Sequence, residues 1–476
     1  MYRSKSAALV AVVALAPAAM AHAQTTTPPS DDPRIAILEQ EVKDLKAEVH
    51  ALRDRLDKTT PVATAATVAP PAAAPNPPTA VAQAAPPAAP PAAPAATSAV
   101  IADVLKGITF SAALDTYYEY NTNRPIGRVN LLRAYDVSSN SFSLNQADFI
   151  AESAADPDHG KRWGLRLDFQ YGQATDTLQG NPANELRPEV YRAIYQAYGT
   201  YVFPIGGGLT VDVGKWASSL GIEGNYTKDQ LNYSRSFWFD FLPFYHTGLR
   251  AKYQLNSLVG LNFWLVNGAE QTEANNDYKD QLYGVVLTPT PTFTWTINYY
   301  RGQEHPDVTY IQNPTAAQMT LPNQQGTFFQ PIANPPTGLL NIGDTYATWQ
   351  ATPKLTLAAE ADYVEQRLFT SSPQQDVWGG ALYAAWQLTP KIALAVRGEY
   401  LNDRYGLYTG LGQALKEATL TIDWRPDDGF LLRGEFRRDS STRPFFYSDT
   451  LGRLLTDQPT IGVGAVWWFG QKTGSW

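Results

Sequence analysis

Trp163-Gly-Leu-Arg-Leu-Asp-Phe-Gln-Tyr171 is apolar at every second position, with charged, polar or small residues between. Because successive side chains of a strand point to opposite faces, this segment predicts a strand with one apolar and one polar face. A soluble sandwich buries such an apolar face against a second sheet, whereas a membrane barrel turns it toward lipid and keeps polar residues inside. Sixteen stretches of this kind fill the chain from about Gly107 to Gly470.

The connections between these stretches alternate strictly between short and long. Most short ones contain Pro, Gly, Asn or Asp, residues that favour tight turns. The short connections are 156–160, 204–208, 256–257, 289–291, 352–354, 389–391 and 426–429. The long connections are 121–140, 174–189, 218–244, 270–278, 302–341, 367–375, 405–413 and 440–458. Hairpins of a soluble sheet are the alternative, but loops this long are uncommon in a compact soluble domain and typical of the outer face of a bacterial barrel.

We therefore predict an all-β fold over residues 105–476, a transmembrane antiparallel β-barrel of about sixteen strands. An even number of strands places both ends of the barrel on the short-turn side, which we assign to the periplasm. Trp349 and Trp386 each stand three residues before a Thr-Pro-Lys turn, which suits an aromatic girdle at a membrane interface. The parity of the pattern turns Leu420 toward lipid and Thr421 toward water, so we expect Arg to be tolerated at Thr421.

Composition agrees with a secreted membrane barrel. The chain has no Cys, a mean hydropathy of -0.28 and, after residue 23, no apolar run of 18 residues that would predict a transmembrane helix. The net charge of -8 offers no basic patch for nucleic acid. Four His residues remain after residue 23, and they fall into no catalytic or metal-binding pattern, so we expect neither an enzyme nor a metal or cofactor site.

The first hundred residues predict three segments. Residues 1–23 have the basic start, apolar core and small-residue cleavage site of a signal peptide. Residues 24–58 contain a heptad pattern of apolar residues with opposite charges at the flanking positions, which favours a parallel coiled coil over a lone amphipathic helix. Residues 59–104 are an Ala/Pro-rich linker, uncharged through residue 102 and long enough to carry the coiled coil toward the cell wall. The heptads favour a dimer, whereas bacterial membrane barrels of about this size are usually trimers, so a homo-oligomer is expected with its order open.

The third long connection is too aromatic, from Phe237 to Tyr245, to lie exposed in water. We expect it to fold into the lumen and to narrow it. Its charged residues Glu223, Arg235 and Asp240 then become candidates for the constriction. Packing beneath the other outer loops or at a subunit interface is the alternative.

Strand parity points many charged side chains inward. A barrel of about sixteen strands leaves an aqueous channel, in which charges of both signs tune ion passage. For any single residue, the alternative is that it only solvates the lumen or pairs across strands. The wall candidates for lining the pore are Arg166, Asp168, Arg192, Arg250, Arg397, Glu399, Arg433 and Glu435.

Asn232-Tyr-Ser-Arg-Ser236, Pro243-Phe-Tyr-His-Thr-Gly-Leu-Arg250 and Val266-Asn-Gly268 resemble the OmpL-like family of β-barrel porins, also called beta-barrel porin 2. The ending Val466-Trp-Trp-Phe-Gly470, with the terminal Trp476, is similar to that family too. The resemblance covers about residues 107–476. It implies an outer-membrane diffusion channel of Gram-negative bacteria and carries no established site residues.

We therefore expect a porin that passes small hydrophilic solutes and ions. Its expected contacts are membrane lipid and lipopolysaccharide around the barrel, and the cell wall through the N-terminal segment. Two alternatives remain open: a structural or adhesive barrel with a plugged lumen, and a sugar-selective channel in which the many Trp and Tyr residues form a stacking track.

Overall fold

A computed structural model describes residues 107–179, 184–312 and 327–470. The predicted signal peptide, coiled coil and linker lie outside these residues. So does the terminal Trp476.

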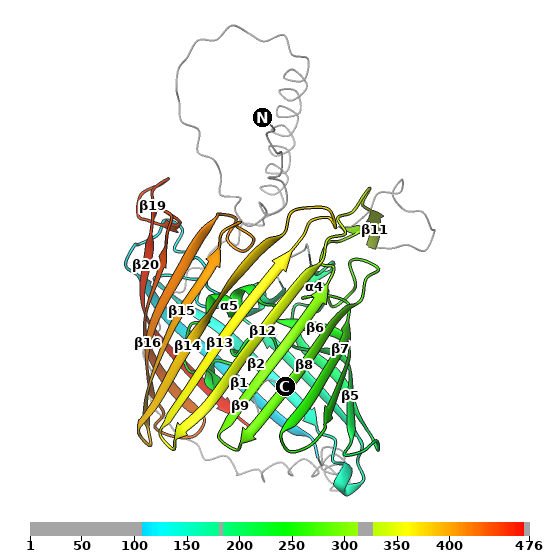
Figure 1. Cartoon of the computed structure of the whole chain (residues 1–476). Helices are drawn as coiled ribbons and strands as arrows, with labels where there is room; N and C mark the ends of the chain where they lie inside the picture. Colours follow the sequence, from blue (N-terminus) through cyan, green and yellow to red (C-terminus); the bar gives the residue numbers. More distant parts are fainter. Residues whose placement is uncertain (1–106, 180–183, 313–326, 471–476) are drawn as a thin grey trace, which may run out of the picture. The chain divides into compact units, whose positions relative to one another are not determined.

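The main body is one closed antiparallel barrel of sixteen strands, in which each strand pairs with its neighbours along the chain and β20 closes the sheet on β1 (Figure 1). This confirms the predicted fold class. The first eight barrel strands are β1 (Thr109–Asn121), β2 (Ser141–Ser153), β3 (Trp163–Tyr171), β4 (Ile194–Phe203), β5 (Leu209–Ala217), β6 (Tyr245–Gln254), β7 (Val259–Val266) and β8 (Asp280–Thr290). The others are β9 (Phe293–Gly302), β12 (Leu340–Thr352), β13 (Leu355–Gln366), β14 (Gln375–Thr389), β15 (Ile392–Asp403), β16 (Gln413–Trp424), β17 (Phe430–Ser441) and β20 (Asp457–Phe469).

The remaining described elements are short and lie in the connections. Two small hairpins pair β10 (Val308–Gln312) with β11 (Thr327–Pro331), and β18 (Phe446–Tyr447) with β19 (Leu454–Leu455). The helical segments are η1 (Pro157–His159), α3 (Gln173–Gln179), α4 (Pro188–Tyr191), η2 (Thr227–Asp229) and α5 (Phe237–Phe241). None of the helices in the described part of the chain has the length and apolarity needed to cross a membrane.

The short connections all lie at one end of the barrel and the long ones begin at the other, as the sequence predicts (Figure 1). The two near-identical turns use the same chemistry. Thr352 Oγ1 accepts hydrogen bonds from the N–H groups of Lys354 and Leu355 at 3.2 and 3.0 Å. Thr389 Oγ1 does the same for Lys391 and Ile392 at 3.2 and 3.1 Å, and each turn carries a register shift before its Thr. A hydroxyl one position before Pro therefore sets both hairpins.

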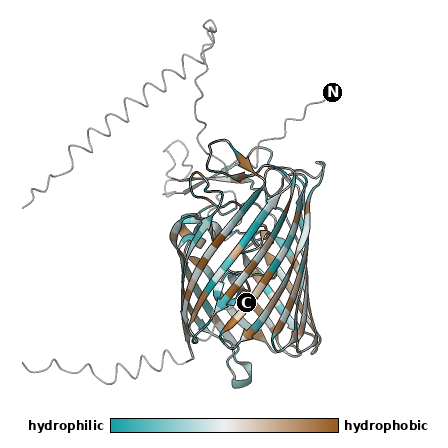
Figure 2. Ribbon diagram, turned by 90° about the vertical axis from the view of Figure 1, so that its left-hand side faces the viewer, coloured by the Kyte–Doolittle hydropathy of each residue, from teal (hydrophilic) through white to brown (hydrophobic). Residues whose placement is uncertain are grey.

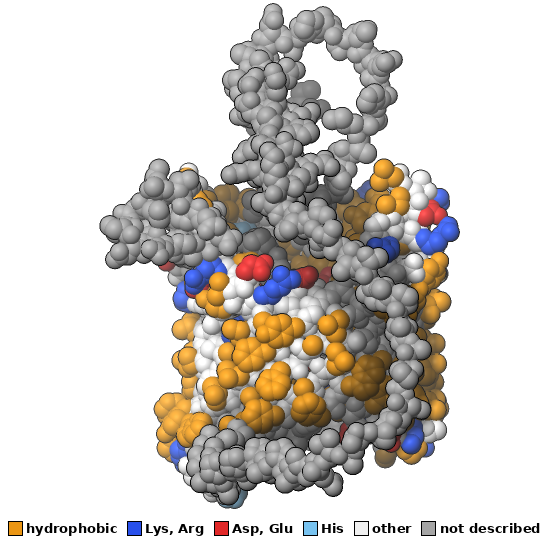
Figure 3. All heavy atoms as spheres, turned by 180° about the vertical axis from the view of Figure 1, so that it is seen from behind, with side chains coloured by type: hydrophobic (Ala, Val, Ile, Leu, Met, Phe, Trp, Pro, Cys, Tyr) orange, Lys and Arg blue, Asp and Glu red, His pale blue; other side chains and the backbone are white. Residues whose placement is uncertain are grey.

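The outward face of the barrel is apolar. Figure 2 shows hydrophobic and hydrophilic residues alternating along the strands, and Figure 3 shows hydrophobic side chains spread over the barrel surface below charged ones at the long-loop rim. Trp349 and Trp386, close to the short turns, are exposed on this face by 47% and 56%. Exposed outward residues also include Trp163, Trp295, Leu420, Ile422 and Phe436, while Leu167 and Phe293 are half-buried. In a bilayer this face supplies the lipid contact.

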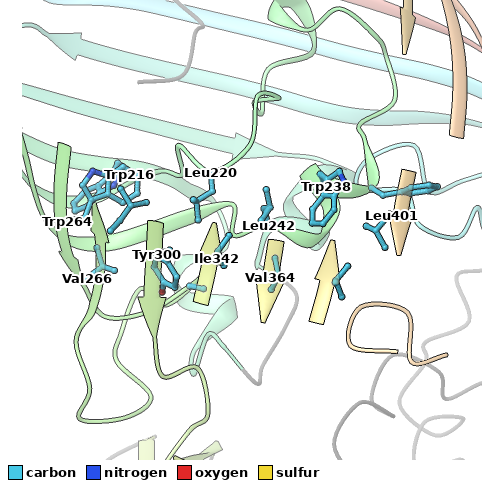
Figure 4. Packing of buried hydrophobic residues seen from close by; sticks show 14 of the residues in the cluster. Trp216, Leu220, Trp238, Leu242, Trp264, Val266, Tyr300, Ile342, Val364 and Leu401 are labelled. Carbon is cyan, nitrogen blue, oxygen red and sulfur yellow. The ribbon is translucent and has the colours of Figure 1, made fainter. Parts of the chain in front are cut away.

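The inward face is divided by level. Near the long-loop ends it is apolar: Trp216, Trp264, Val266, Leu282, Tyr300, Ile342, Val364, Val377, Leu401 and Leu415 form an apolar collar drawn from nine strands (Figure 4). Nearer the middle it carries charged side chains, most of them buried. At the short-turn end, inward residues such as Thr294 and Thr348 are exposed.

One expectation about the inward face is wrong. Thr421 does point inward, but it is fully buried rather than open to water. Its hydroxyl accepts a hydrogen bond from Asn232 Nδ2 at 2.7 Å and donates one to Glu435 Oε2 at 2.7 Å. The alternation along the strand predicted the correct face for Thr421, but it could not show that a loop covers this residue.

Candidate functional site: the inner loop in the barrel lumen

The third long connection, residues 218–244, runs inside the barrel, and we call it the inner loop. It leaves β5, passes through η2 and α5, and returns into β6; Figure 1 shows α5 within the barrel. Ser236 begins α5 by accepting a hydrogen bond from Phe239 N–H through its hydroxyl at 2.9 Å. The helix ends at Phe241, two residues before Pro243.

The aromatic side of the inner loop packs against the apolar collar. Phe237 and Trp238 are fully buried, and Leu242 is buried beside them (Figure 4). Burial of each such side chain contributes on the order of 1.5–3 kcal/mol. The aromatic run therefore finds its cover in the lumen, against inward apolar side chains that a uniformly polar pore would lack.

Two carboxylates of the wall hold the backbone of the loop. Glu399 accepts hydrogen bonds from the N–H groups of Phe237 and Trp238 at 2.9 and 3.0 Å. Glu435 accepts from the N–H groups of Tyr233 and Ser234 at 2.6 and 2.9 Å. Charge-assisted hydrogen bonds of this kind are roughly twice as strong as neutral ones, so the two acids fix the middle of the loop.

Three arginines of the same wall hold the carbonyl groups of the loop. Arg397 donates to Ser234 O at 2.8 Å, and Arg437 donates to Arg235 O. Arg433 donates to the carbonyls of Thr227, Gln230 and Asn232 at 3.1, 2.8 and 2.9 Å. Their charges are matched on the wall itself: Arg397 pairs with Glu417 at 3.1 Å, Arg433 with Asp423 at 2.6 Å and Arg437 with Asp439 at 2.7 Å.

The three charged candidates of the loop itself all have partners. Arg235 is buried, and its guanidinium donates to the carbonyls of Gly224, Tyr233 and Asn225 at 3.0, 2.6 and 2.9 Å. Glu223 pairs with Arg397 at 2.7 Å and accepts from Ser236 N–H at 2.6 Å. Asp240 accepts from Tyr408 Oη at 2.6 Å. Arg235 thus joins the two limbs of the loop, a use of its charge that the sequence did not indicate.

Three further wall candidates occupy the opposite side of the lumen. Arg166 and Asp168 lie on β3, pair at 3.3 Å, and both contact the hydroxyl of Tyr226 from the inner loop. Arg250, on β6, pairs with Asp212 at 2.7 Å, and its guanidinium carbon lies 5.0 and 5.7 Å from the ring centroids of Trp216 and Trp264. Arg250 therefore ties the collar to the charged level below it.

Arg192 is placed differently from the prediction. It caps the C-terminal end of α4, before β4 begins, so strand parity does not apply to it. Its side chain is 41% exposed and pairs with Asp176 of α3 and, at 3.6 Å, with Glu189. It belongs to a long connection and not to the wall.

The first long connection contributes residues that the sequence did not single out. Arg133 is buried and pairs with Asp439 of β17 at 2.9 Å, with Asp136, and with Glu119 of β1 at 3.7 Å. Tyr135 donates to Asn225 Oδ1 of the inner loop at 2.6 Å. The only signal for these contacts was an Arg and an Asp among apolar residues, Leu131 to Asp136, in a loop expected to be polar.

Cavities remain in the barrel, and one of them borders the inner loop. One of about 280 Å³ follows residues 217–225 and is bounded on the wall by Val286, Thr294, Thr296, Tyr346 and Thr348. A second of about 730 Å³ lies toward the short turns, between inward residues of β2 to β8, and Val286 lines it as well. Hydroxyl groups of Thr294, Thr296, Thr348 and Tyr346 border the gap between the inner loop and strands β8, β9 and β12.

A model of the family described as putative beta-barrel porin-2, OmpL-like, matches residues 107–469. No curated protein sequence matches the chain. Among solved structures, OmpT of Vibrio cholerae is similar at 11% identity and a TM-score of 0.47, covering 76% of this chain and 97% of that one. An anion-selective porin from Comamonas acidovorans (9% identity, TM-score 0.47, 76% and 99% covered) and the channel DcaP of Acinetobacter baumannii (10%, 0.46, 76% and 97%) are similar to the same extent. Similarity at this level transfers neither a solute nor an ion selectivity.

Proposed function

We propose that this chain, which belongs to the putative beta-barrel porin-2, OmpL-like family, forms a water-filled channel for the passive diffusion of small hydrophilic solutes and ions. Family membership supports an outer-membrane location, and we assign the barrel to a Gram-negative cell on that basis. In this proposal the short turns face the periplasm, the long loops face outward, and the apolar outer face contacts lipid and lipopolysaccharide.

The observation that supports a channel is the gap beside the inner loop. The loop is held to the wall on its charged side, and the smaller cavity follows its other side, with the larger cavity lying toward the short turns. Thr294, Thr296, Thr348 and Tyr346 offer hydroxyl groups there, and Glu223 is the nearby acid of the loop. A narrow passage with polar, mostly neutral walls suits small hydrophilic solutes.

Cysteine block tests this route, because the chain has no native Cys. Thr348→Cys places a thiol at the gap, and Trp349→Cys places one on the outward face one residue later. In a planar bilayer, a bulky cationic methanethiosulfonate reagent should reduce the current through Thr348→Cys and leave Trp349→Cys unchanged. Equal responses, or no current from the unmodified protein, contradict the proposal.

A structural barrel with a plugged lumen is the second candidate. The packing of the inner loop against the apolar collar favours it, because Trp238 and Leu242 of the loop fill space inside the collar. This candidate predicts a folded barrel without single-channel events, whereas the channel predicts discrete conductance steps. The same bilayer recording separates the two.

We further propose that the N-terminal segment lies in the periplasm and joins chains through its heptads into a homo-oligomer, dimer or trimer. The support is the sequence pattern between Ile35 and Leu56. A peptide of residues 31–57 should sediment as an oligomer, and the oligomeric fraction should increase with peptide concentration. Sedimentation as a monomer at high concentration removes this part of the proposal.

A further inference from the structure

Three acidic side chains meet on the inner face of two neighbouring strands. Asp344 of β12 is the direct cross-strand partner of Asp362 of β13, and Glu360 stands two residues before Asp362 on the same face. Each offers a carboxylate oxygen, and these oxygens all lie within 4.8 Å of one another. Like charges directly opposite each other on a sheet are destabilising, so this arrangement needs a compensating interaction.

The cluster is buried and has no cationic partner among the described residues. Asp344, Glu360 and Asp362 are 2%, 5% and 5% exposed. None of them pairs with Lys, Arg or His in the part of the chain that the structure describes, whereas the wall acids Glu417, Asp423 and Asp439 each pair with an arginine. Both oxygens of Asp362 and Oδ1 of Asp344 accept no hydrogen bond from an N–H or O–H donor, although they are inaccessible to solvent, and the carboxyl groups of the two residues contact each other. Buried carboxylate oxygens without partners are costly, which points to a missing ligand.

The first limb of the inner loop docks on this cluster. Ile222 N–H donates to Glu360 Oε1 at 3.0 Å, and Asn298 Nδ2 bridges Asp344 Oδ2 and Ser219 O at 2.8 and 3.0 Å. Gly221 has a φ of +82°, and a Cβ there would lie 3.1 Å from Glu360 Oε1, so only glycine fits this approach comfortably. The acids therefore stand where the loop meets the wall, next to Gly221 and Ile222, which line the smaller cavity.

We propose that Asp344, Glu360 and Asp362 bind a hard divalent cation of the Ca²⁺ class, which fixes the first limb of the inner loop to strands β12 and β13. Such a cation takes oxygen ligands at about 2.3–2.6 Å, so ligand oxygens on opposite sides are about 4.6–5.2 Å apart. The oxygens of the cluster fit within that span. The charge of the ion offsets most of the three negative charges. Any change of conductance on metal binding rests on the proposed channel, whereas the binding of metal itself does not.

Direct metal binding by the full-length protein in detergent is the first test. TbCl₃ serves as a luminescent probe, because Tyr383 donates to Glu360 at 3.3 Å and is close enough to sensitise it. CaCl₂ should displace Tb³⁺. Asp362→Asn should weaken Tb³⁺ binding by at least about tenfold, because it removes a direct ligand. The matched control is Asp148→Asn, a lumen carboxylate of similar burial outside the cluster, which should bind Tb³⁺ like the parent.

A second measurement uses only the parent protein, so it remains informative if Asp362→Asn does not fold. The thermal unfolding midpoint of the parent should rise with CaCl₂ and fall with a chelator, since a ligand that binds only the folded state stabilises it. The competing explanation is that the acids share protons, in which case Asp362→Asn raises the midpoint and CaCl₂ does nothing. No Tb³⁺ binding by the parent, equal binding by Asp362→Asn, or a midpoint insensitive to CaCl₂ each overturns the site. Metal binding without any single-channel current instead overturns only the proposed channel.

Discussion

Strand β17 and the strand pair β12–β13 present acids to the same inner loop, but their surroundings differ. On β17, inward residues alternate in sign from Arg433 through Glu435 and Arg437 to Asp439, and loop backbone groups complete their contacts. On β12 and β13 the inward charges are all negative, and Asp362 accepts no hydrogen bond from an N–H or O–H donor. A wall that alternates in sign neutralises itself and holds a loop through hydrogen bonds alone, whereas a wall of one sign needs a counterion from outside.

The largest effect is expected on the self-neutralising wall. Arg433→Ala removes donors from three loop carbonyls and leaves Asp423 without its partner. Breaking a buried ion pair costs about 3–5 kcal/mol, and the freed loop should raise single-channel conductance. Arg438→Ala on the same strand, whose side chain is 58% exposed, should change the free energy of unfolding by less than about 0.5 kcal/mol. Urea unfolding in detergent compares the two variants. An equal loss in the free energy of unfolding would argue against Arg433 as an anchor of the inner loop.

The next prediction compares the part of the inward face that the inner loop covers with the part near the short turns that it leaves open. Leu420→Lys puts a charge on the outward face and should cost about 2–4 kcal/mol near the bilayer midplane. Thr421→Arg should also be damaging, because the side chain has no space beneath Asn232. Thr348→Arg, inward but exposed near the short turns, should fold normally. The folded fraction on cold SDS gels tests all three, and full tolerance at Thr421 would mean that the loop does not cover it.

The smallest effect concerns Glu270, in the loop after β7. Burial raises the pKa of its carboxyl to about 7, although Phe244 N–H, which donates at 3.2 Å, lowers it. A raised pKa means that the charged form is disfavoured in the folded state, so stability is lost as pH rises from about 4.5 to 7. Glu270→Gln should therefore raise the thermal midpoint at pH 8 and leave it unchanged at pH 4. The exposed Glu189→Gln is the control, and a gain at both pH values contradicts the assignment.

Period-2 patterning predicted the strands, their faces and every short turn, because these depend on local geometry and on side-chain polarity. The aromatic composition of Phe237 to Tyr245 led to the location of this run in the lumen, since such a run must be buried somewhere. The period-2 patterning did not predict what lies against the inward face. Thr421 has the correct parity, yet its neighbour Asn232 is 189 residues away in the chain.

The collar and the placement of Arg192 show the same limit. The pattern predicted a polar inward face throughout, because it assigns one environment to each face and not to each level. The inward residues Ile342 and Val364 are instead apolar and belong to the collar. Arg192 precedes β4 by two residues, and no periodicity marks that boundary. Partners of opposite charge far apart in sequence, such as Arg133 and Asp439, have no local signature at all.

Single-channel recording in a planar bilayer tests most directly whether the inner loop narrows a conducting lumen. The parent should give discrete steps, and deletion of residues 226–240, which removes η2 and most of α5, should give larger ones from a barrel that still folds. A folded deletion variant with the conductance and ion selectivity of the parent would contradict the account, as would a parent that never conducts.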